Sequence, residues 1–182
     1  MQPVRRLKQG LAKLATPERC LFTPSDMRAL VPDISDQSWR ALLSRSAQEI
    51  GLVRLCRGLY LYLPAERPDG LLLFRAAARL RARDFYYLSL ETVLSEAGVI
   101  SQVQQCWISV MTSGRGGTIS CGRRGTIEFI HTSRKPDQLA QHLTYDDRYG
   151  MLRADVTLAI RDMRATRRDL DLIDWSVVNE PA

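Results

Sequence analysis

The stretch GLVRLCRGLYLYLP, residues 51–64, decides how the first part of the chain folds. Two apolar runs flank the dipeptide Arg57-Gly58, and glycine supplies the positive φ that a tight two-residue turn requires. The stretch therefore predicts a β-hairpin. Arg54 and Arg57 place two cations on or near the tip of this otherwise apolar ribbon. Because a short hairpin is marginal alone, we expect Val53, Leu55, Tyr60 and Tyr62 to pack beneath helices.

Three helices are predicted before the hairpin. Apolar residues recur at helical spacing over residues 4–15. Thr23 is a good N-cap for a short second helix, which starts at Pro24 and ends at Pro32. Ser35 caps a third helix, residues 36–50, and Gly51 suits the left-handed position that closes it.

The third helix shows two different faces. Its apolar face predicts that Trp39 lies in the core, and its outward face lacks acids and carries short or forked hydrogen-bond donors. An ordinary solvated helix has such a face too, but the order of three helices and then a hairpin is that of a winged helix-turn-helix domain. There the third helix enters the DNA major groove and the hairpin, or wing, lies beside the backbone. The predicted DNA-binding residues are Gln37, Arg40, Ser44, Arg45, Gln48, Arg54 and Arg57.

The second part of the chain is expected to form a separate domain after a linker at residues 64–70. Helices are predicted over residues 71–82, after Ser89 and over residues 154–166, and strands in QCWISVMTS, GTIEFIHTS and, less clearly, GTISC. The predicted fold class is α+β. A winged helix-turn-helix domain, residues 1–66, precedes a larger mixed α/β domain, residues 67–182, with a small, mostly antiparallel sheet.

Charge and composition narrow the choice of partners. The formal net charge is +6, and residues 1–67 contain 11 Lys and Arg against 6 Asp and Glu. A basic first third points to a polyanion. No apolar run approaches the roughly 20 residues of a membrane span, and the N-terminus lacks the apolar core of a signal peptide, so we expect a cytoplasmic protein with no membrane partner. The four cysteines lack metal-site or disulfide spacing.

No catalytic constellation is evident. SGRGGTISCGRRG, residues 113–125, has the glycines of a phosphate loop but no following helix or Lys-Ser/Thr pair, which favours a connection between strands. No recognisable catalytic or metal-binding pattern is formed by the histidines, His131 and His142, or by the adjacent acids, Asp146 and Asp147. The aromatic residues 85–87 are more typical of packing than of base stacking. We therefore predict no enzyme, metal or cofactor. A secondary basic patch is predicted from Arg115, Arg123, Arg124 and Arg134.

Two motifs carry a resemblance to a known family. The chain resembles the AbiEi family of type IV toxin–antitoxin antitoxins in the order and spacing of these motifs. The first motif is LFTPSDMRAL with the following GLVRLCRGLYLY, and the second is YYLSLETVLSEAGVI. The resemblance spans roughly residues 7–174. It implies an N-terminal winged helix that binds inverted repeats in the promoter of its own operon, at residues 35–50 and 52–63 here. It also implies a C-terminal domain that counters a nucleotidyltransferase-like toxin without a stable complex.

The resulting hypothesis is a DNA-binding antitoxin and autorepressor that takes part in phage defence by abortive infection. It would be a monomer in solution, loaded as two copies on double-stranded DNA, since no apolar heptad predicts a dimer. Many members of that family carry a PERAL-like stretch before their final helix, whereas this chain has LRADVTLAIRDM there. An alternative is therefore an orphan regulator, which keeps the fold but has lost its toxin partner. A second alternative is a protein-docking inhibitor, and a third is an enzyme that acts on nucleic acid.

Overall fold

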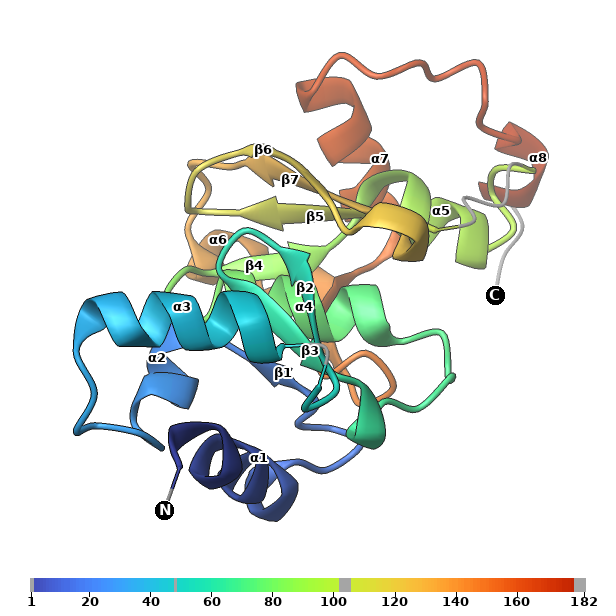
Figure 1. Ribbon diagram of the computed structural model, residues 1–182. Helices are drawn as coiled ribbons and strands as arrows, with labels where there is room; N and C mark the ends of the chain where they lie inside the picture. The colour runs from blue at the N-terminus through green and yellow to red at the C-terminus, as the bar shows by residue number, and fades with distance from the viewer. Residues whose placement is uncertain (1, 48, 102–105, 179–182) are drawn as a thin grey trace. The chain divides into compact units, whose positions relative to one another are not determined.

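The computed structural model describes residues 2–47, 49–101 and 106–178, and they form an α+β protein (Figure 1). The chain divides into two compact units, residues 1–70 and 71–182, each with its own sheet. The predicted boundary after residue 66 therefore lies a few residues before the observed one. No helix in the described ranges has the length and apolar character needed to cross a bilayer.

The first unit combines helices with a three-stranded antiparallel sheet. In chain order its elements are α1 (Pro3–Leu14), β1 (Leu21–Phe22), α2 (Pro24–Arg28), α3 (Asp36–Ser46), β2 (Leu52–Cys56) and β3 (Leu59–Tyr62), followed by a single helical turn at Leu63–Ala65. The strand order is β1-β3-β2. The predicted hairpin is β2–β3, and Gly58 in its turn has φ +80°. β1 was not predicted.

Side-chain caps begin α2 and α3 where the sequence places them. The Thr23 hydroxyl accepts the backbone N–H of Asp26 at 3.1 Å, and the Asp26 carboxylate accepts the N–H of Thr23 at 2.7 Å. Ser35 caps α3 by accepting the N–H of Ser38 at 3.2 Å. The helix ends at Ser46, earlier than predicted, because the chain turns there and the N–H of Leu52 donates to the carbonyl of Ala47.

The core of the first unit lies between its helices and one face of its sheet. Trp39 belongs to this core, as predicted. On the hairpin, Leu52 pairs with Tyr62, which places both on the core side, and Tyr60 packs at its margin. Val53 does not join them, because alternate residues of a strand point to opposite faces. Leu55 is buried, as predicted, but it is not part of this cluster.

The second unit is built on a six-stranded sheet in the order β6-β7-β5-β4-β9-β8. The strands are β4 (Tyr86–Leu88), β5 (Trp107–Thr112), β6 (Gly117–Ser120), β7 (Thr126–His131), β8 (Leu143–Asp146) and β9 (Met151–Ala154). The helices are α4 (Leu72–Leu80), α5 (Leu90–Glu96), α6 (Pro136–Leu139), α7 (Val156–Ala165) and α8 (Trp175–Val178), with single turns at Gly122–Arg124 and Ala140–His142. β4 pairs with β9 in parallel, as does β5 with β7. The sheet is therefore larger and more mixed than predicted.

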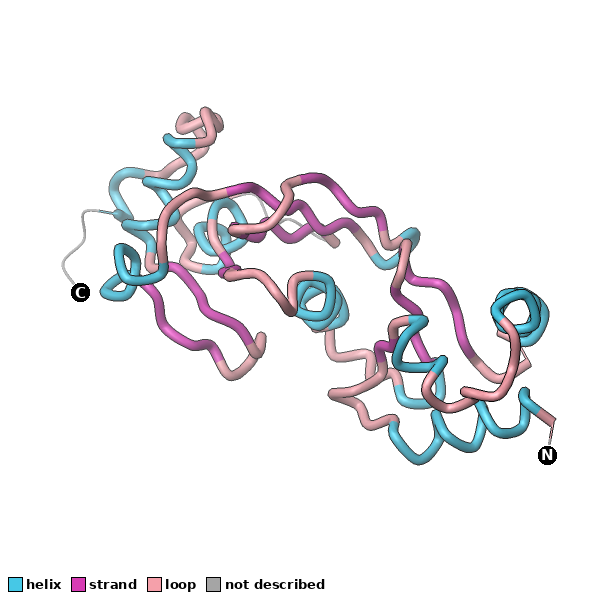
Figure 2. Tube along the Cα trace, turned by 90° about the vertical axis from the view of Figure 1, so that its left-hand side faces the viewer, coloured by secondary structure: helices cyan, strands magenta, loops and turns pink. Residues whose placement is uncertain are grey.

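Helices cover both faces of this sheet (Figure 2). Neighbouring residues of β7 show the two sides. Glu128 pairs with Arg168, which follows α7, whereas the ring of Phe129 lies 3.9 Å below the guanidinium of Arg81, which follows α4. α5 and α7 pack together on the Glu128 side, and α4 covers the Phe129 side. This second unit thus has a core of its own.

Candidate nucleic-acid interface

A groove of about 620 Å³ lies between α3 and the β2–β3 hairpin of the first unit. Its rim is basic and its floor is apolar. The residues that line it are Arg40, Leu43, Ser44, Arg45, Ala47, Leu52, Val53, Arg54 and Tyr60. Four of the seven predicted DNA-binding residues, Arg40, Ser44, Arg45 and Arg54, therefore share one groove.

The register of the hairpin explains why Arg54 reaches this groove. Arg54 lies opposite Tyr60, and both point to the same side as the core residues Leu52 and Tyr62. A bulge follows, between Arg54 and Cys56. The Arg54 Nε donates to the carbonyl of Cys56 at 3.4 Å, which ties the side chain to the bulge.

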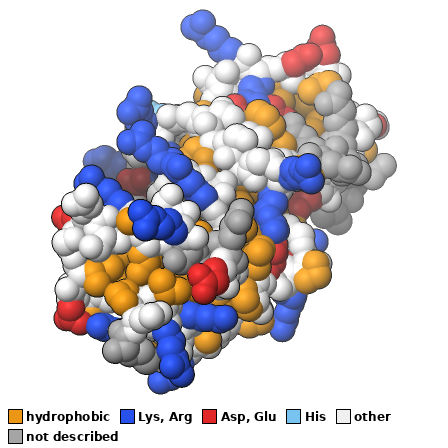
Figure 3. Space-filling model, in the orientation of Figure 1, with side chains coloured by type: hydrophobic (Ala, Val, Ile, Leu, Met, Phe, Trp, Pro, Cys, Tyr) orange, Lys and Arg blue, Asp and Glu red, His pale blue; other side chains and the backbone are white. Residues whose placement is uncertain are grey.

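The remaining predicted residues lie around the groove. Gln37 is exposed about one turn before Arg40 on α3, and Arg57 is exposed in the hairpin turn. Gln48 lies outside the described residues. Over this unit, Figure 3 shows Lys and Arg side chains bordering a field of hydrophobic side chains. The structure thus presents cations from two elements around one concave surface.

The cations of this surface are exposed, and most of them have no acid partner in the described part of the chain. Among the residues that the structure describes, Arg40, Arg45 and Arg57 make no ion pair, although all three are exposed. Two acids of the unit are close to other arginines. Asp33 pairs with Arg6 at 2.7 Å, and Asp36 lies 3.8 Å from Arg28. Unpaired guanidinium groups are suited to phosphate oxygens and to base edges.

Arg28 holds the connection between α2 and α3. Its guanidinium donates to the carbonyls of Val31 and Ile34, and it also approaches Asp36 at the start of α3. The loop carbonyls would otherwise lack these donors. The arrangement fixes the entry of the chain into α3 and, with it, the direction of the exposed helix face.

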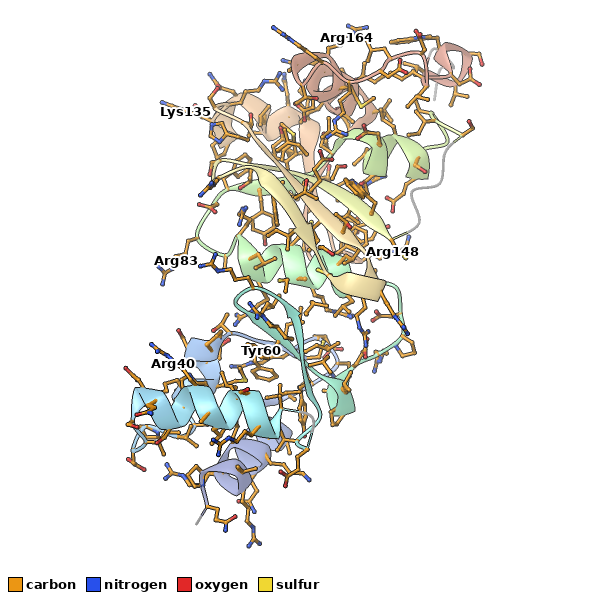
Figure 4. All side chains as sticks on the ribbon, turned by 45° about the horizontal axis from the view of Figure 1, so that its top comes forward. Arg40, Tyr60, Arg83, Lys135, Arg148 and Arg164 are labelled. Atoms are coloured by element: carbon orange, nitrogen blue, oxygen red, sulfur yellow. The ribbon has the colours of Figure 1, made fainter. Side chains whose placement is uncertain are left out.

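Tyr60 is a groove residue that the sequence analysis placed only in the core. It is half-buried, and its hydroxyl has no hydrogen-bond partner within the described part of the chain. Figure 4 shows Tyr60 on the sheet side of α3, which carries Arg40. Strand alternation was the available signal, since the residue opposite Arg54 has to share its face.

The predicted secondary patch of Arg115, Arg123, Arg124 and Arg134 is not one surface. Arg115 precedes β6 and Arg134 follows β7, whereas Arg123 and Arg124 lie in the β6–β7 turn at the opposite end of these strands. A strand of the length of β7 separates the two ends by about 20 Å. Arg134 is also engaged, because it pairs with the buried Asp162 at 2.5 Å.

The residues weighed for chemistry lie in separate places. Nδ1 of His131 lies 2.9 Å from the carbonyl oxygen of Gly114, and Nδ1 of His142 lies 2.7 Å from the Asp155 carboxylate. Asp146 ends β8, and Asp147 lies in the turn that follows. Within the described ranges, no three His, Cys, Asp or Glu side chains are grouped so as to hold a metal. The glycine-rich segment forms β6 and the turns on either side of it.

No family model and no curated protein matches the chain. One similar solved structure is that of the Rv2827c protein from Mycobacterium tuberculosis, which is 14% identical, with a TM-score of 0.47. The match covers 76% of this chain and about half, 51%, of that one.

Proposed function

We propose that the first unit is a winged-helix DNA-binding domain and that the protein represses transcription of its own operon as a type IV antitoxin. The groove between α3 and the hairpin carries this proposal, because exposed cations from both elements line it and the described residues supply them with no acid. The uneven charge of the chain gives independent support, since the first third holds most of the net positive charge.

In this proposal the two elements have different tasks. α3 enters the major groove, where Gln37, Arg40 and Arg45 reach base edges and Ser44 reaches a base or a phosphate. The hairpin lies along the sugar–phosphate backbone, which Arg54 and Arg57 contact. Base contacts give sequence preference, whereas the backbone contacts give affinity that falls steeply with salt.

The antitoxin part of the proposal rests on the sequence resemblance to the AbiEi family. Under it, two copies of the chain load onto inverted repeats in the promoter, and the second unit counters a nucleotidyltransferase-like toxin encoded by the same operon. An orphan regulator would bind DNA in the same way but would have no such neighbour. Co-expression of the adjacent gene separates these cases: growth arrest by that gene, relieved by this chain, is expected of an antitoxin.

DNA binding is tested by titrating the full chain into labelled duplexes, one from the region upstream of its own gene and one of random sequence. Arg45→Ala should weaken binding to the upstream duplex by about 1–3 kcal/mol if the contact is bidentate, with a smaller loss on random DNA. Arg57→Ala should weaken binding to both duplexes equally and lower the salt slope by about one unit. Arg19→Ala is the matched control, because Arg19 is exposed in the same unit but lies before β1.

The outcomes that contradict the proposal are equally specific. Absence of binding to either duplex at low salt would favour a protein-docking module in place of a DNA reader. Equal losses for Arg45→Ala and Arg19→Ala would remove α3 from the interface. An unchanged salt slope for Arg57→Ala would remove the hairpin tip.

A further inference from the structure

The strand β8 lies at one edge of the six-stranded sheet and is paired on one side, with β9. The N–H of Asp155 donates to the carbonyl of His142 at 2.9 Å, so the even-numbered positions of β8 direct their backbone groups toward β9. Because backbone groups alternate in direction along an antiparallel strand, those of Leu143 and Tyr145 point away from β9. They form no hydrogen bond with any residue that the structure describes. The outer side of β8 is therefore an open strand edge.

The residues of β8 do not protect this edge. Edge strands often carry Lys, Pro or a bulge, each of which hinders pairing with another chain. β8 reads LTYD and pairs with β9 in an uninterrupted register. Thr144 is exposed, and Tyr145 is 59% exposed, more than any other large hydrophobic residue in the described ranges. The edge thus combines open backbone groups with an aromatic side chain that gains free energy on burial.

The opposite edge of the sheet, β6, is less suited to pairing with a second copy. It begins at Gly117, whose φ is +147°; Arg115 lies before it, and Arg123 and Arg124 lie after it. In an antiparallel pair of β6 strands, the arginine at one end of the first strand would lie near the arginines at the other end of the second. Like charges that face each other across a sheet are destabilising. Of the two edges, β8 is therefore the one that fits a second copy of this chain.

An antiparallel pair of β8 strands has one register that suits its side chains. The open backbone groups allow Leu143 of each copy to lie opposite Tyr145 of the other, with about four backbone hydrogen bonds between the copies. Thr144 then lies opposite itself on the two-fold axis. Threonine pairs and pairs of an aromatic with an apolar side chain stabilise antiparallel sheets. His142 lies opposite Asp146 in the same register, and the two attract each other when the imidazole is protonated.

The neighbouring registers are less favourable. With Tyr145 opposite itself, Leu143 would lie opposite the charged Asp147, which lines a groove of about 500 Å³ beside β8. With Leu143 opposite itself, the pairing would extend into Ala140–His142, which form a helical turn and not a strand. The side chains and the length of β8 therefore select the register with Thr144 on the two-fold axis.

We propose that two copies of the chain form a two-fold symmetric dimer by antiparallel pairing of their β8 strands, which joins the two sheets into one. The same surface of both copies forms this contact, so the assembly closes after two copies. Because the edge is short, the interface is small and the dimer should be reversible. A monomer was expected from the lack of an apolar heptad, but the pairing of strand edges requires no heptad. The inference goes beyond the proposed function and does not depend on DNA binding.

Sedimentation equilibrium of the full chain without DNA, at concentrations from about 1 μM to 1 mM, measures the dimer. Thr144→Lys places two like charges at the two-fold axis and should raise the dissociation constant of the dimer about fivefold or more. Thr144→Glu should have the same effect. An equimolar mixture of the two variants should form a heterodimer with a dissociation constant within about twofold of that of the unmodified chain, because opposite charges then meet. Thr118→Lys is the control, since Thr118 is exposed on the other edge strand, β6.

The mixture makes the test specific. Recovery of the dimer would support pairing at Thr144, because a misfolded variant could not be restored by another variant. A monomer over the whole concentration range would overturn the proposal. A dimer that Thr144→Lys leaves unchanged, that Thr118→Lys weakens equally, or that the mixture does not restore would also overturn it. Since no DNA is present, each of these results would leave the proposed DNA contacts of α3 and the hairpin in place.

Discussion

Removal of the Asp162 carboxylate should destabilise the second unit by about 3–5 kcal/mol, which is the range for breaking a buried ion pair. Asp162 lies on α7 and is fully buried. Its Oδ2 accepts the hydroxyl of Ser89 at 2.8 Å and that of Tyr87 at 3.0 Å, and its Oδ1 pairs with Arg134 at 2.5 Å. Burial, and then the charge of Asp162, raise the pKa of the Tyr87 phenol, which stays a hydrogen-bond donor.

The magnitude follows from what each group does after Asp162→Ala. Ser89 is fully buried, so it is left with an unsatisfied hydroxyl at a cost of about 1–3 kcal/mol. The buried Tyr87 hydroxyl loses Asp162 but keeps a hydrogen bond with Thr132, so its share of the loss is smaller. The Arg134 side chain is 29% exposed and can turn to water, which limits its share of the loss. Asp162→Asn keeps an acceptor for the hydroxyls and should cost less, about 1–2 kcal/mol.

Urea unfolding of the full chain, followed by circular dichroism, measures these losses. Asp171→Ala is the control, because Asp171 is exposed and an ordinary surface change stays within about 0.5 kcal/mol. Tyr87→Phe removes one of the same hydrogen bonds, so its effect and that of Asp162→Ala should not add. A loss below about 1 kcal/mol for Asp162→Ala, or strict additivity with Tyr87→Phe, would refute this account of the network.

Three further predictions concern other parts of the chain. Burial and a hydrogen bond to Glu96 raise the pKa of Tyr149 from 10.0 to about 12. The stability that this shift contributes should therefore be complete below pH 10 and should be lost as the pH rises through the folded-state pKa. In unfolding curves recorded at increasing pH, Tyr149→Phe should lose less stability over this range than the unmodified chain. Gly125→Ala should lower the melting temperature strongly, because φ is +119° and the new Cβ would lie 2.2 Å from the carbonyl oxygen of Cys106. Gly70→Ala is the control, since Gly70 also has a positive φ but a Cβ there would meet no atom within 4 Å, so the decrease should be smaller. Equal decreases in melting temperature would contradict the steric argument. Thr23→Ala should cost about 1 kcal/mol by removing one half of the capping box of α2, whereas Thr23→Ser should restore most of it in the same urea titration.

Local signals in the sequence predicted the elements that local interactions build. The caps at Thr23 and Ser35 and the turn at Gly58 each depend on residues within three or four positions, and the structure contains all three. β4 was missed because only three residues form it, and they directly precede a correctly predicted helix. Its parallel partner β9 lies more than sixty residues later, a pairing that no local pattern reports.

The motif YYLSLET illustrates what sequence resemblance and structure each contribute. As a pattern, it was one of two stretches that pointed to a family. In the structure its polar residues have definite partners across the sheet face: Tyr87 and Ser89 bind Asp162, and Glu91 pairs with Arg168 at 2.7 Å. All the partners come from α7 or the segment after it, so the motif joins the middle of the second unit to its C-terminal part. That stabilising role requires no catalytic chemistry.

The candidate interface depends on which face of the hairpin turns toward α3, and the periodicity of the sequence does not predict this orientation. A shift of one residue in the strand pairing would move a whole set of side chains to the other face. Because Leu52 and Tyr62 are buried in the core of the first unit, Arg54 and Tyr60 are obliged to point to the same side, where α3 forms the opposite wall of the groove. The apolar packing of the hairpin therefore sets the position of its charge. If the first unit binds DNA as proposed, a change at Leu52 should consequently weaken that binding through Arg54, although Leu52 itself is buried.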